Sequence, residues 1–342
     1  MTQPLTITPA TSFAAARRPA LTLLTPEDRA AAAARAAADA AARETAARGR
    51  DTRTRVLLGQ VRARLDAAPV ADAPVDLSTL GVSSALVIAP HPDDEVIGCG
   101  GLLWHLVHHG ARVTVLFLTR EGGRSITKPT RVAGVARRDR ERRAAERILY
   151  YASAEQLPFE ERSLEPARRD GRLRAALAPR LAATSPDLVI APSWHELHPD
   201  HRAAAHETIA AARALWQAGA LPSLRGVLLY EIWGACAIAD AYVPIPRAAA
   251  HDMRRALACY ESQTDTVDYQ ALMATLKETR ARRLGVHATS DGWELSDARA
   301  VADVPAAPWA EAYQALWTAD DAARYLAALP DGGVPNAEGA AR

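Results

Sequence analysis

The stretch Ala85-Leu86-Val87-Ile88-Ala89-Pro90-His91-Pro92-Asp93-Asp94-Glu95 decides the fold of this 342-residue chain. It opens with an uninterrupted apolar run, which is typical of a strand that is buried on both faces of a sheet. Residues 96–109 then have the pattern of a helix, and residues 112–118 form a second apolar run. A strand, a helix and another strand within about thirty residues predict a βαβ unit with parallel strands.

The same alternation of strands and helices continues along the chain. We expect further elements over residues 137–151 (helix), 188–191 (strand), 201–218 (helix) and 227–231 (strand). Because the strands are apolar on both sides, helices must cover both faces of the sheet. The sequence therefore predicts the α/β class, with a parallel sheet flanked by helices. Residues 247–283 and 310–329 are also expected to be helical, with Trp317 on the apolar face of the last helix.

The first 80 residues predict a helical N-terminal extension. Pro26 begins an alanine-rich helix that we expect to end at Gly49, and residues 52–65 carry apolar side chains at helical spacing. The proline-containing segment 67–76 is expected to be a linker. The chain is accordingly divided into an extension and linker over residues 1–80, a main domain over 81–305, and a C-terminal helix and tail over 306–342.

Charge and cysteine content exclude several classes of protein. The 41 basic and 40 acidic residues give a formal net charge of +1, which lacks the basic excess of a nucleic-acid-binding protein. No apolar run approaches the ~20 residues that a membrane span needs. The three cysteines form no CxxC pair, which argues against a disulfide framework or a cysteine-ligated zinc site and favours a cytoplasmic location. Lysine occurs only at Lys128 and Lys277, because the other basic residues are arginine.

Two clusters of histidine and acidic residues follow predicted strands. The first is His91-Pro92-Asp93-Asp94-Glu95, and the second is His195-Glu196-Leu197-His198-Pro199-Asp200-His201. Ligands of parallel sheets collect outside the carboxyl ends of the strands, so both clusters are expected at one edge. A catalytic zinc site takes three protein ligands, commonly two histidines and a carboxylate, and leaves one position open. The two clusters therefore predict a metal site with further groups available for proton transfer.

Two alternative interpretations of these segments are less consistent with the sequence. A lone His-Pro-Asp turn is usually a helix cap beside a solvated histidine, but two such clusters at strand ends in one domain argue against that interpretation. The run Gly98-Cys99-Gly100-Gly101 suggests a dinucleotide-binding turn, yet the third glycine of GxGxxG is missing.

Residues 90–95 together with 198–201 resemble the two signature motifs of the PIG-L/LmbE-like zinc-dependent de-N-acetylase family. The resemblance extends over about residues 82–285. Its weaker landmarks are Arg138-x-x-Glu141, Tyr230-Glu231-x-Trp233 and Leu257-Ala258-Cys259-Tyr260-x-Ser262-Gln263. The resemblance implies a Rossmann-like, LmbE-like catalytic domain over residues 81–305, to which this chain adds its helical N-terminal extension.

Carried over residue by residue, the resemblance implies a metal site and a general base. His91, Asp94 and His201 would bind Zn²⁺, although His/His/Asp ligation also suits Fe²⁺ and Co²⁺. Asp93 would be the general base that takes a proton from the metal-bound water. Glu95 is expected to anchor the loop by accepting hydrogen bonds from its backbone.

The resemblance also implies groups that contact the substrate. His198 would stabilise the oxyanion, and Asp200 would orient the His198 imidazole. Glu121, Arg124 and Arg138 are expected as substrate-binding residues.

The sequence departs from the family pattern at two places. The Thr-x-Gly-Glu turn after the second strand is altered, since residues 119–124 read Thr-Arg-Glu-Gly-Gly-Arg. An Ala-Glu-x-Phe segment near the C-terminus has no counterpart over residues 285–304, where we expect it.

The resemblance implies a hydrolase that removes the N-acetyl group from an amino sugar or an N-acetylglucosaminyl-type conjugate. Such a substrate would be a natural-product or small-thiol pathway intermediate. Two alternatives stay open: an amidase of the thiol-conjugate type that cleaves a larger acyl group, and a non-catalytic binding module. The expected partner is a small N-acylated molecule rather than a nucleic acid, and the sequence leaves open whether the chain forms a homo-oligomer.

Overall fold

The computed structural model describes residues 26–120, 131–263, 267–286 and 309–328. The chain divides into two compact units, Met1–Arg48 and Gly49–Arg342. In the first unit the described residues are all helical and belong to α1 (Pro26–Ala67), which continues into the second unit. No helix among the described residues has the length and apolar character needed to cross a membrane.

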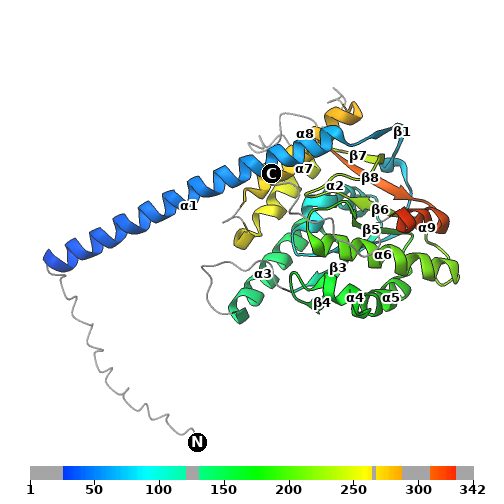
Figure 1. The fold of residues 1–342 in the computed structure, drawn as a ribbon, viewed down its shortest axis with the longest axis horizontal. Coiled ribbons are helices and arrows are strands. Elements are labelled where there is room, and N and C mark those ends of the chain that lie inside the picture. Colours follow the sequence, from blue (N-terminus) through cyan, green and yellow to red (C-terminus); the bar gives the residue numbers. More distant parts are fainter. Residues whose placement is uncertain (1–25, 121–130, 264–266, 287–308, 329–342) are drawn as a thin grey trace, which may run out of the picture. The chain divides into compact units, whose positions relative to one another are not determined.

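The second unit is built on an eight-stranded sheet of described residues (Figure 1). Its order is β1-β7-β8-β6-β5-β2-β3-β4. The strands are β1 (Val70–Asp76), β2 (Ser84–Ala89), β3 (Arg112–Thr119), β4 (Ser153–Phe159), β5 (Leu188–Pro192), β6 (Gly226–Tyr230), β7 (Ala239–Ile245) and β8 (Trp309–Leu316). Strand β8 runs antiparallel to its neighbours β6 and β7, and the other pairs are parallel.

Helices cover both faces of this sheet (Figure 1). Along β2, Ala85, Val87 and Ala89 face one core, and Leu86 and Ile88 face the other. The first core contains residues of α2 (Asp94–His108), α3 (Arg131–Leu149), α7 (Arg247–Ala258) and α8 (Tyr269–Leu284). The second contains residues of α4 (Leu164–Arg169), α5 (Arg172–Thr184), α6 (Pro199–Gln217) and α9 (Ala319–Ala328). The predicted Rossmann-like α/β class is thereby confirmed.

Two of the predicted elements are wrong. The segment 67–76 is not a linker, because residues 70–76 form β1 and pair in parallel with β7. Its proline at position 74 is tolerated because β1 is an edge strand of the sheet. The two helices expected over 26–49 and 52–65 are one helix, α1.

The C-terminal helix predicted over 310–329 is also wrong in its first half. Residues 309–316 form β8 and only residues 319–328 are helical, so that Trp317 lies between the two elements. The sequence of β8 favours a helix locally, but the strand fills the gap between β6 and β7 and bonds to both of them. Tertiary pairing therefore overrides local propensity. The Ala-Glu-x-Phe segment expected over 285–304 stands on this strand as Ala310-Glu311-Ala312-Tyr313, with tyrosine in place of phenylalanine.

Helix α2 is broken at Cys99, whose φ of −138° and ψ of 20° are not helical. The glycines around the break allow close packing rather than dinucleotide binding. A Cβ on Gly98 would lie 2.3 Å from the Tyr230 ring, and one on Gly101 would lie 2.7 Å from Ile245.

A buried ion pair supplies hydrogen bonds at this break. Lys277 Nζ lies 2.9 Å from Glu311 Oε1, and the two side chains are only 3% and 1% exposed. Lys277 donates to the carbonyl of Gly98 (3.2 Å), where the first helical segment ends. Glu311 accepts from the N–H groups of Gly101 (2.8 Å) and Leu102 (2.9 Å), where the second begins. The pair therefore satisfies backbone groups that the break leaves without helical partners.

Replacing Lys277 by methionine should leave Glu311 buried without its counter-charge. We expect Lys277→Met to lower the free energy of unfolding by about 3–5 kcal/mol, the usual effect of removing one partner of a buried pair. Arg143→Met is the matched control, because Arg143 forms a surface ion pair with Asp139 and is 62% exposed, and such pairs contribute about 0–1 kcal/mol. Denaturant unfolding of both variants checks this, and equal losses would contradict it.

Candidate active site

The two predicted clusters meet at one edge of the sheet. The residues after β2 form the loop 90–93 that leads into α2, and the residues after β5 form the loop 193–198 that leads into α6. Strands β2 and β5 are parallel neighbours, with Ala85 opposite Leu188 and Val87 opposite Ile190. Both loops therefore leave the sheet at the same end, and the side chains that follow them lie together.

Three donor atoms from the two clusters form a small triangle. Asp94 Oδ2 lies 3.2 Å from His91 Nδ1 and 3.2 Å from His201 Nε2, and the two nitrogens are 3.3 Å apart. A tetrahedral zinc ion with bonds of about 2.0–2.1 Å holds its ligand atoms about 3.3 Å from one another. The spacing of His91, Asp94 and His201 thus fits three ligands of one metal ion.

His198 lies close to this triangle but outside it. The ring nitrogens that His91, His198 and His201 offer spread over up to 4.8 Å. Two ligands with bonds of about 2.1 Å to one ion can be at most about 4.2 Å apart. Asp94, and not His198, is therefore the better third ligand.

Each histidine of the triangle directs its other ring nitrogen at a carboxylate. His91 Nε2 lies 3.1 Å from Asp200 Oδ2, and His201 Nδ1 lies 3.5 Å from Glu196 Oε2. Such outer carboxylates commonly orient histidine ligands of metals. Glu196 was not predicted as a site residue, although its place between His195 and His198 in the sequence could have indicated it. It also accepts hydrogen bonds from the N–H groups of residues 232 (2.5 Å) and 233 (2.8 Å), after β6.

Asp200 does not orient the side chain that the sequence suggested. Its carboxylate bonds to His91 and accepts the N–H groups of Arg162 (2.5 Å) and Leu164 (3.1 Å). Only its backbone N–H reaches His198, donating to Nδ1 over 3.2 Å. This bond fixes the His198 tautomer, because Nδ1 is the acceptor and the proton of a neutral ring must be on Nε2.

The charges of the cluster attract a cation. Burial by itself lowers the pKa of His91, but hydrogen bonds to Asp200 and Asp94 outweigh burial and raise it to about 10. Burial also opposes protonation of His201, whose pKa the Asp94 charge and hydrogen bond raise to about 9. Burial raises the pKa of Asp94, yet His201 and His91 bring it well below its ordinary value. The carboxylates therefore hold positive charge firmly, as a metal site requires.

His198 has the opposite character. Burial lowers its pKa to about 3, and the charges of His91 and His201 act in the same direction. The ring is therefore neutral at neutral pH and presents Nε2–H as a hydrogen-bond donor.

Asp93 has a strained backbone in a buried setting. Its φ of 122° and ψ of −25° lie in a region that residues other than glycine rarely adopt. Its N–H donates to Glu95 Oε2 (2.9 Å), as expected for a loop anchored by Glu95. Burial raises the pKa of Asp93 to about 8, against the opposing charge of Arg138. A carboxyl group with such a pKa can exchange a proton near neutral pH.

The weaker landmarks of the sequence hold the Asp93 loop. Tyr260 donates from its hydroxyl to Glu95 Oε1 over 2.5 Å. Arg138 donates to the carbonyl of Pro92 over 2.7 Å, and its guanidinium lies 5.5 Å from the centre of the Tyr260 ring. Glu141 in turn accepts the N–H (2.9 Å) and the hydroxyl (2.6 Å) of Ser262. Residues far apart in the sequence thus form one support beneath this loop.

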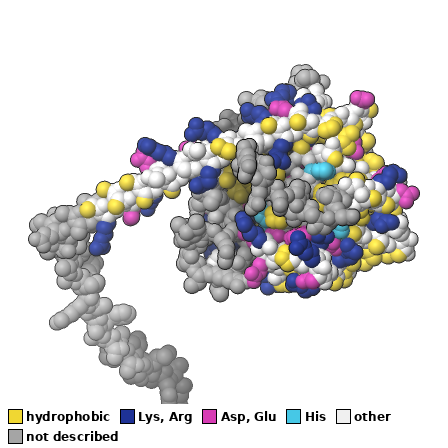
Figure 2. Space-filling view, in the orientation of Figure 1, with side chains coloured by type: hydrophobic (Ala, Val, Ile, Leu, Met, Phe, Trp, Pro, Cys, Tyr) yellow, Lys and Arg dark blue, Asp and Glu magenta, His cyan; other side chains and the backbone are white. Residues whose placement is uncertain are grey.

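Of the three expected substrate contacts, the structure describes one. Arg138 is 3% exposed, its Nη2 is 3.7 Å from Asp93 Oδ2, and its Nε and Nη1 have no hydrogen-bond partner among the described residues. Glu121 and Arg124 lie outside the described residues. On the face shown in Figure 2, acidic and basic side chains are interspersed and form no extended basic patch.

Comparison with known proteins gives matches in sequence. Residues 86–212 match the family model described as PIG-L, GlcNAc-PI de-N-acetylase. A diacetylchitobiose deacetylase of Thermococcus kodakarensis is 34% identical over 128 residues, which are 35% of this chain and 46% of that protein. The chain thus aligns with about half the length of this curated relative.

Solved structures share the fold. A model of an N,N'-diacetylchitobiose deacetylase from Pyrococcus horikoshii superposes with a TM-score of 0.52 at 20% identity, covering 75% of this chain and 90% of that one. A 4-carboxy-2-hydroxymuconate hydratase from Pseudomonas putida KT2440 gives 0.50 at 21% identity, covering 68% and 96%. At these identities the likeness concerns the fold alone. The sequence match, which includes both histidine and acidic clusters, places this chain in the PIG-L/LmbE-like de-N-acetylase family.

Proposed function

We propose that this protein is a metal-dependent hydrolase that removes the acetyl group from an N-acetylated amino sugar or from a conjugate of one. The observation that carries the proposal is the triangle of His91, Asp94 and His201 donor atoms, 3.2–3.3 Å apart, beside the buried carboxyl group of Asp93. The sugar is inferred from the family description and from the deacetylase of diacetylchitobiose that resembles this chain.

The residues present fit a divalent ion. His91, Asp94 and His201 would hold it, and zinc is the first choice because two imidazoles and a carboxylate are a common catalytic zinc set. When bound, such an ion polarises the acyl carbonyl and makes a water molecule more acidic. Asp200 and Glu196 would keep the two imidazoles in the orientation that ligation requires.

Two side chains would move or hold protons during the reaction. Asp93 takes a proton from the attacking water as the water oxygen bonds to the acyl carbon. It then delivers that proton to the nitrogen as the C–N bond breaks, which yields acetate and the free amine. His198, neutral and protonated on Nε2, donates a hydrogen bond to the acyl oxygen as negative charge develops there. Arg138 holds the Pro92 carbonyl and so fixes the loop that carries Asp93.

The proposal is tested by measuring acetate and amine released from N,N'-diacetylchitobiose, N-acetylglucosamine conjugates and N-acyl thiol conjugates. We expect acetate and amine in equal amounts, loss of both with a chelator, and recovery with Zn²⁺. Asp93→Asn should lower kcat by about 10²–10⁴, the usual contribution of a general base, while the protein keeps its bound metal. Amine release without acetate would favour the amidase that cleaves a larger acyl group, and no release from any substrate would contradict hydrolysis.

The strained backbone at Asp93 gives a prediction about stability. Asp93→Ala and Asp93→Gly both remove the carboxyl group, but only glycine adopts φ of 122° without strain. We expect the glycine variant to unfold with a free energy about 1–2 kcal/mol higher than the alanine variant, within the range of such backbone strain. Denaturant unfolding of the metal-free proteins measures the difference. An alanine variant as stable as the glycine variant would show that the backbone there is unstrained.

Asp200 should act on the metal through His91. We expect Asp200→Asn to weaken Zn²⁺ binding by about 10–100-fold, which is the usual effect of losing an outer carboxylate of a histidine ligand. Competition with a chromophoric chelator measures this affinity without reference to activity. Asp139→Asn, on the surface of α3, is the control and should bind Zn²⁺ as the unaltered protein does. Equal affinities for both variants would rule out this role for Asp200.

A further inference from the structure

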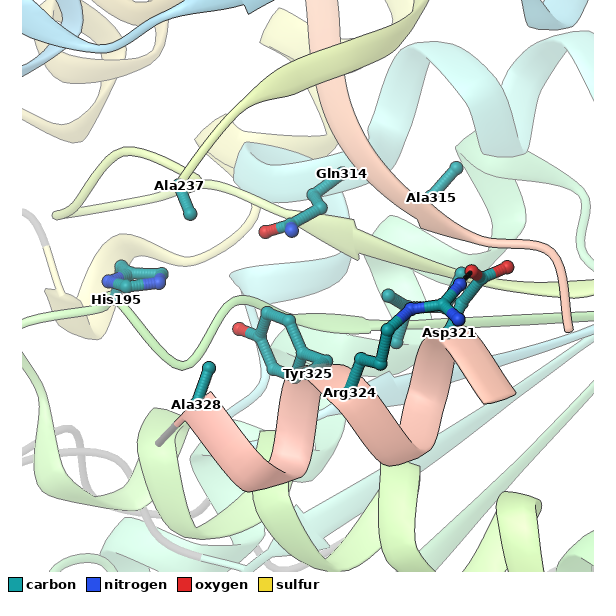
Figure 3. A pocket seen from close by; sticks show the side chains of 9 residues that line it. His195, Ala237, Gln314, Ala315, Asp321, Arg324, Tyr325 and Ala328 are labelled. Carbon is teal, nitrogen blue, oxygen red and sulfur yellow. Dashed lines mark hydrogen bonds and ion pairs between the residues drawn. The ribbon is translucent and has the colours of Figure 1, made fainter. Parts of the chain in front are cut away.

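A pocket of about 410 Å³ lies beside the loop that carries His198, but none of the residues of the metal cluster lines it (Figure 3). Its volume is within the range of pockets that hold small molecules. Its walls come from the loop after β5, the loop between β6 and β7, strand β8 and helix α9. The lining residues are His195, Ala237, Gln314, Ala315, Leu316, Asp321, Arg324, Tyr325 and Ala328.

Most of the lining is apolar, with one polar group that lacks a partner. The Tyr325 ring, Leu316 and three alanine methyl groups provide the apolar surface. Figure 3 shows the amide group of Gln314 projecting from β8 into the pocket, opposite the Tyr325 ring on α9. The amide oxygen is buried and has no hydrogen-bond partner among the described residues. An unsatisfied buried acceptor of this kind costs about 1–3 kcal/mol, so a ligand that donates an O–H group there is favoured.

The charged groups of the pocket balance one another. Asp321 and Arg324 form an ion pair on neighbouring turns of α9. His195 lies near Tyr325, with ring centres 6.4 Å apart, and burial lowers the pKa of its imidazole. The lining as a whole is therefore neutral at neutral pH and offers no excess charge to an ionic ligand.

The pocket wall is tied to the loop after β5. The backbone N–H of Trp194 donates to the Tyr325 hydroxyl over 3.2 Å, and the N–H of His195 donates to Ser193 Oγ over 3.1 Å. These bonds hold His195 at the pocket while the next residue, Glu196, faces His201. The wall is thus built from ordered parts of the fold.

We infer that this pocket binds an uncharged ring bearing hydroxyl groups, such as a pyranose, at a site separate from the metal centre. The apolar face of the ring packs on Tyr325 and the alanine methyl groups. One ring hydroxyl donates to the Gln314 oxygen, and the others reach His195 and the Asp321–Arg324 pair at the rim. This site does not depend on the proposed hydrolase activity.

The test uses the full chain, freed of metal with a chelator, and methyl β-glucopyranoside, which has no acetyl group to lose. Calorimetry and saturation-transfer NMR measure its binding, with glucose 6-phosphate as the charged analogue. Ala328→Trp fills the pocket from the exposed end of α9, and Gln314→Leu removes the unpaired acceptor. Ala327→Trp is the matched control, because Ala327 is exposed on the same helix but does not line the pocket.

We expect saturable binding of the glucoside to the unaltered protein, to Ala327→Trp and to the metal-centre variant His198→Ala. Binding should be at least tenfold weaker in both Ala328→Trp and Gln314→Leu, with thermal unfolding showing that these variants are folded. The inference is overturned by any of three results. These are no saturable binding to the unaltered protein, loss of binding in His198→Ala with full binding in Ala328→Trp, or tighter binding of glucose 6-phosphate than of the glucoside.

Discussion

The parallel pairing of β2 with β5 is the constraint on which the candidate active site depends. The two strands are matched from Ala85 opposite Leu188 to Val87 opposite Ile190, so they end at the same edge of the sheet. Each strand is followed by a short loop and the first turn of a helix, and these two loops carry all of the clustered histidine and acidic residues. A change in the relative position of the strands by one residue would separate the donor atoms that now lie 3.2–3.3 Å apart.

The loop after β2 is held from several directions because its backbone is strained at Asp93. Glu95 accepts the Asp93 N–H and the Tyr260 hydroxyl, and Arg138 holds the Pro92 carbonyl. Behind the loop, the break in α2 is stabilised by Lys277 and Glu311, which come from α8 and β8. Strain of this kind persists only where surrounding contacts determine the backbone, and here the contacts come from four separate elements. The supporting residues thus contribute to the geometry of the site without reaching its centre.

Much of the fold could be predicted because its central strands are apolar on both faces. Strands β2, β3, β5 and β6 lie in the middle of the sheet, and their continuous apolar runs allow little besides a buried strand. The edge strand β1, with proline at position 74, has no such run and resembles a linker. Strand β8 has the local composition of a helix, and only its position between β6 and β7 makes it a strand.

The sequence by itself determined that His91, Asp93, Asp94, His198 and His201 belong to one site, because their positions after predicted strands bring them to one edge of a parallel sheet. Tertiary structure alone decided how these groups are paired. It directed Asp200 to His91, gave His201 the carboxylate of Glu196, and placed one of only two lysines against Glu311. Such pairings depend on side-chain directions and on contacts between residues more than 100 positions apart, for which local sequence patterns carry no signal. The sequence contains the donor groups, and the packing of the elements selects which donor meets which acceptor.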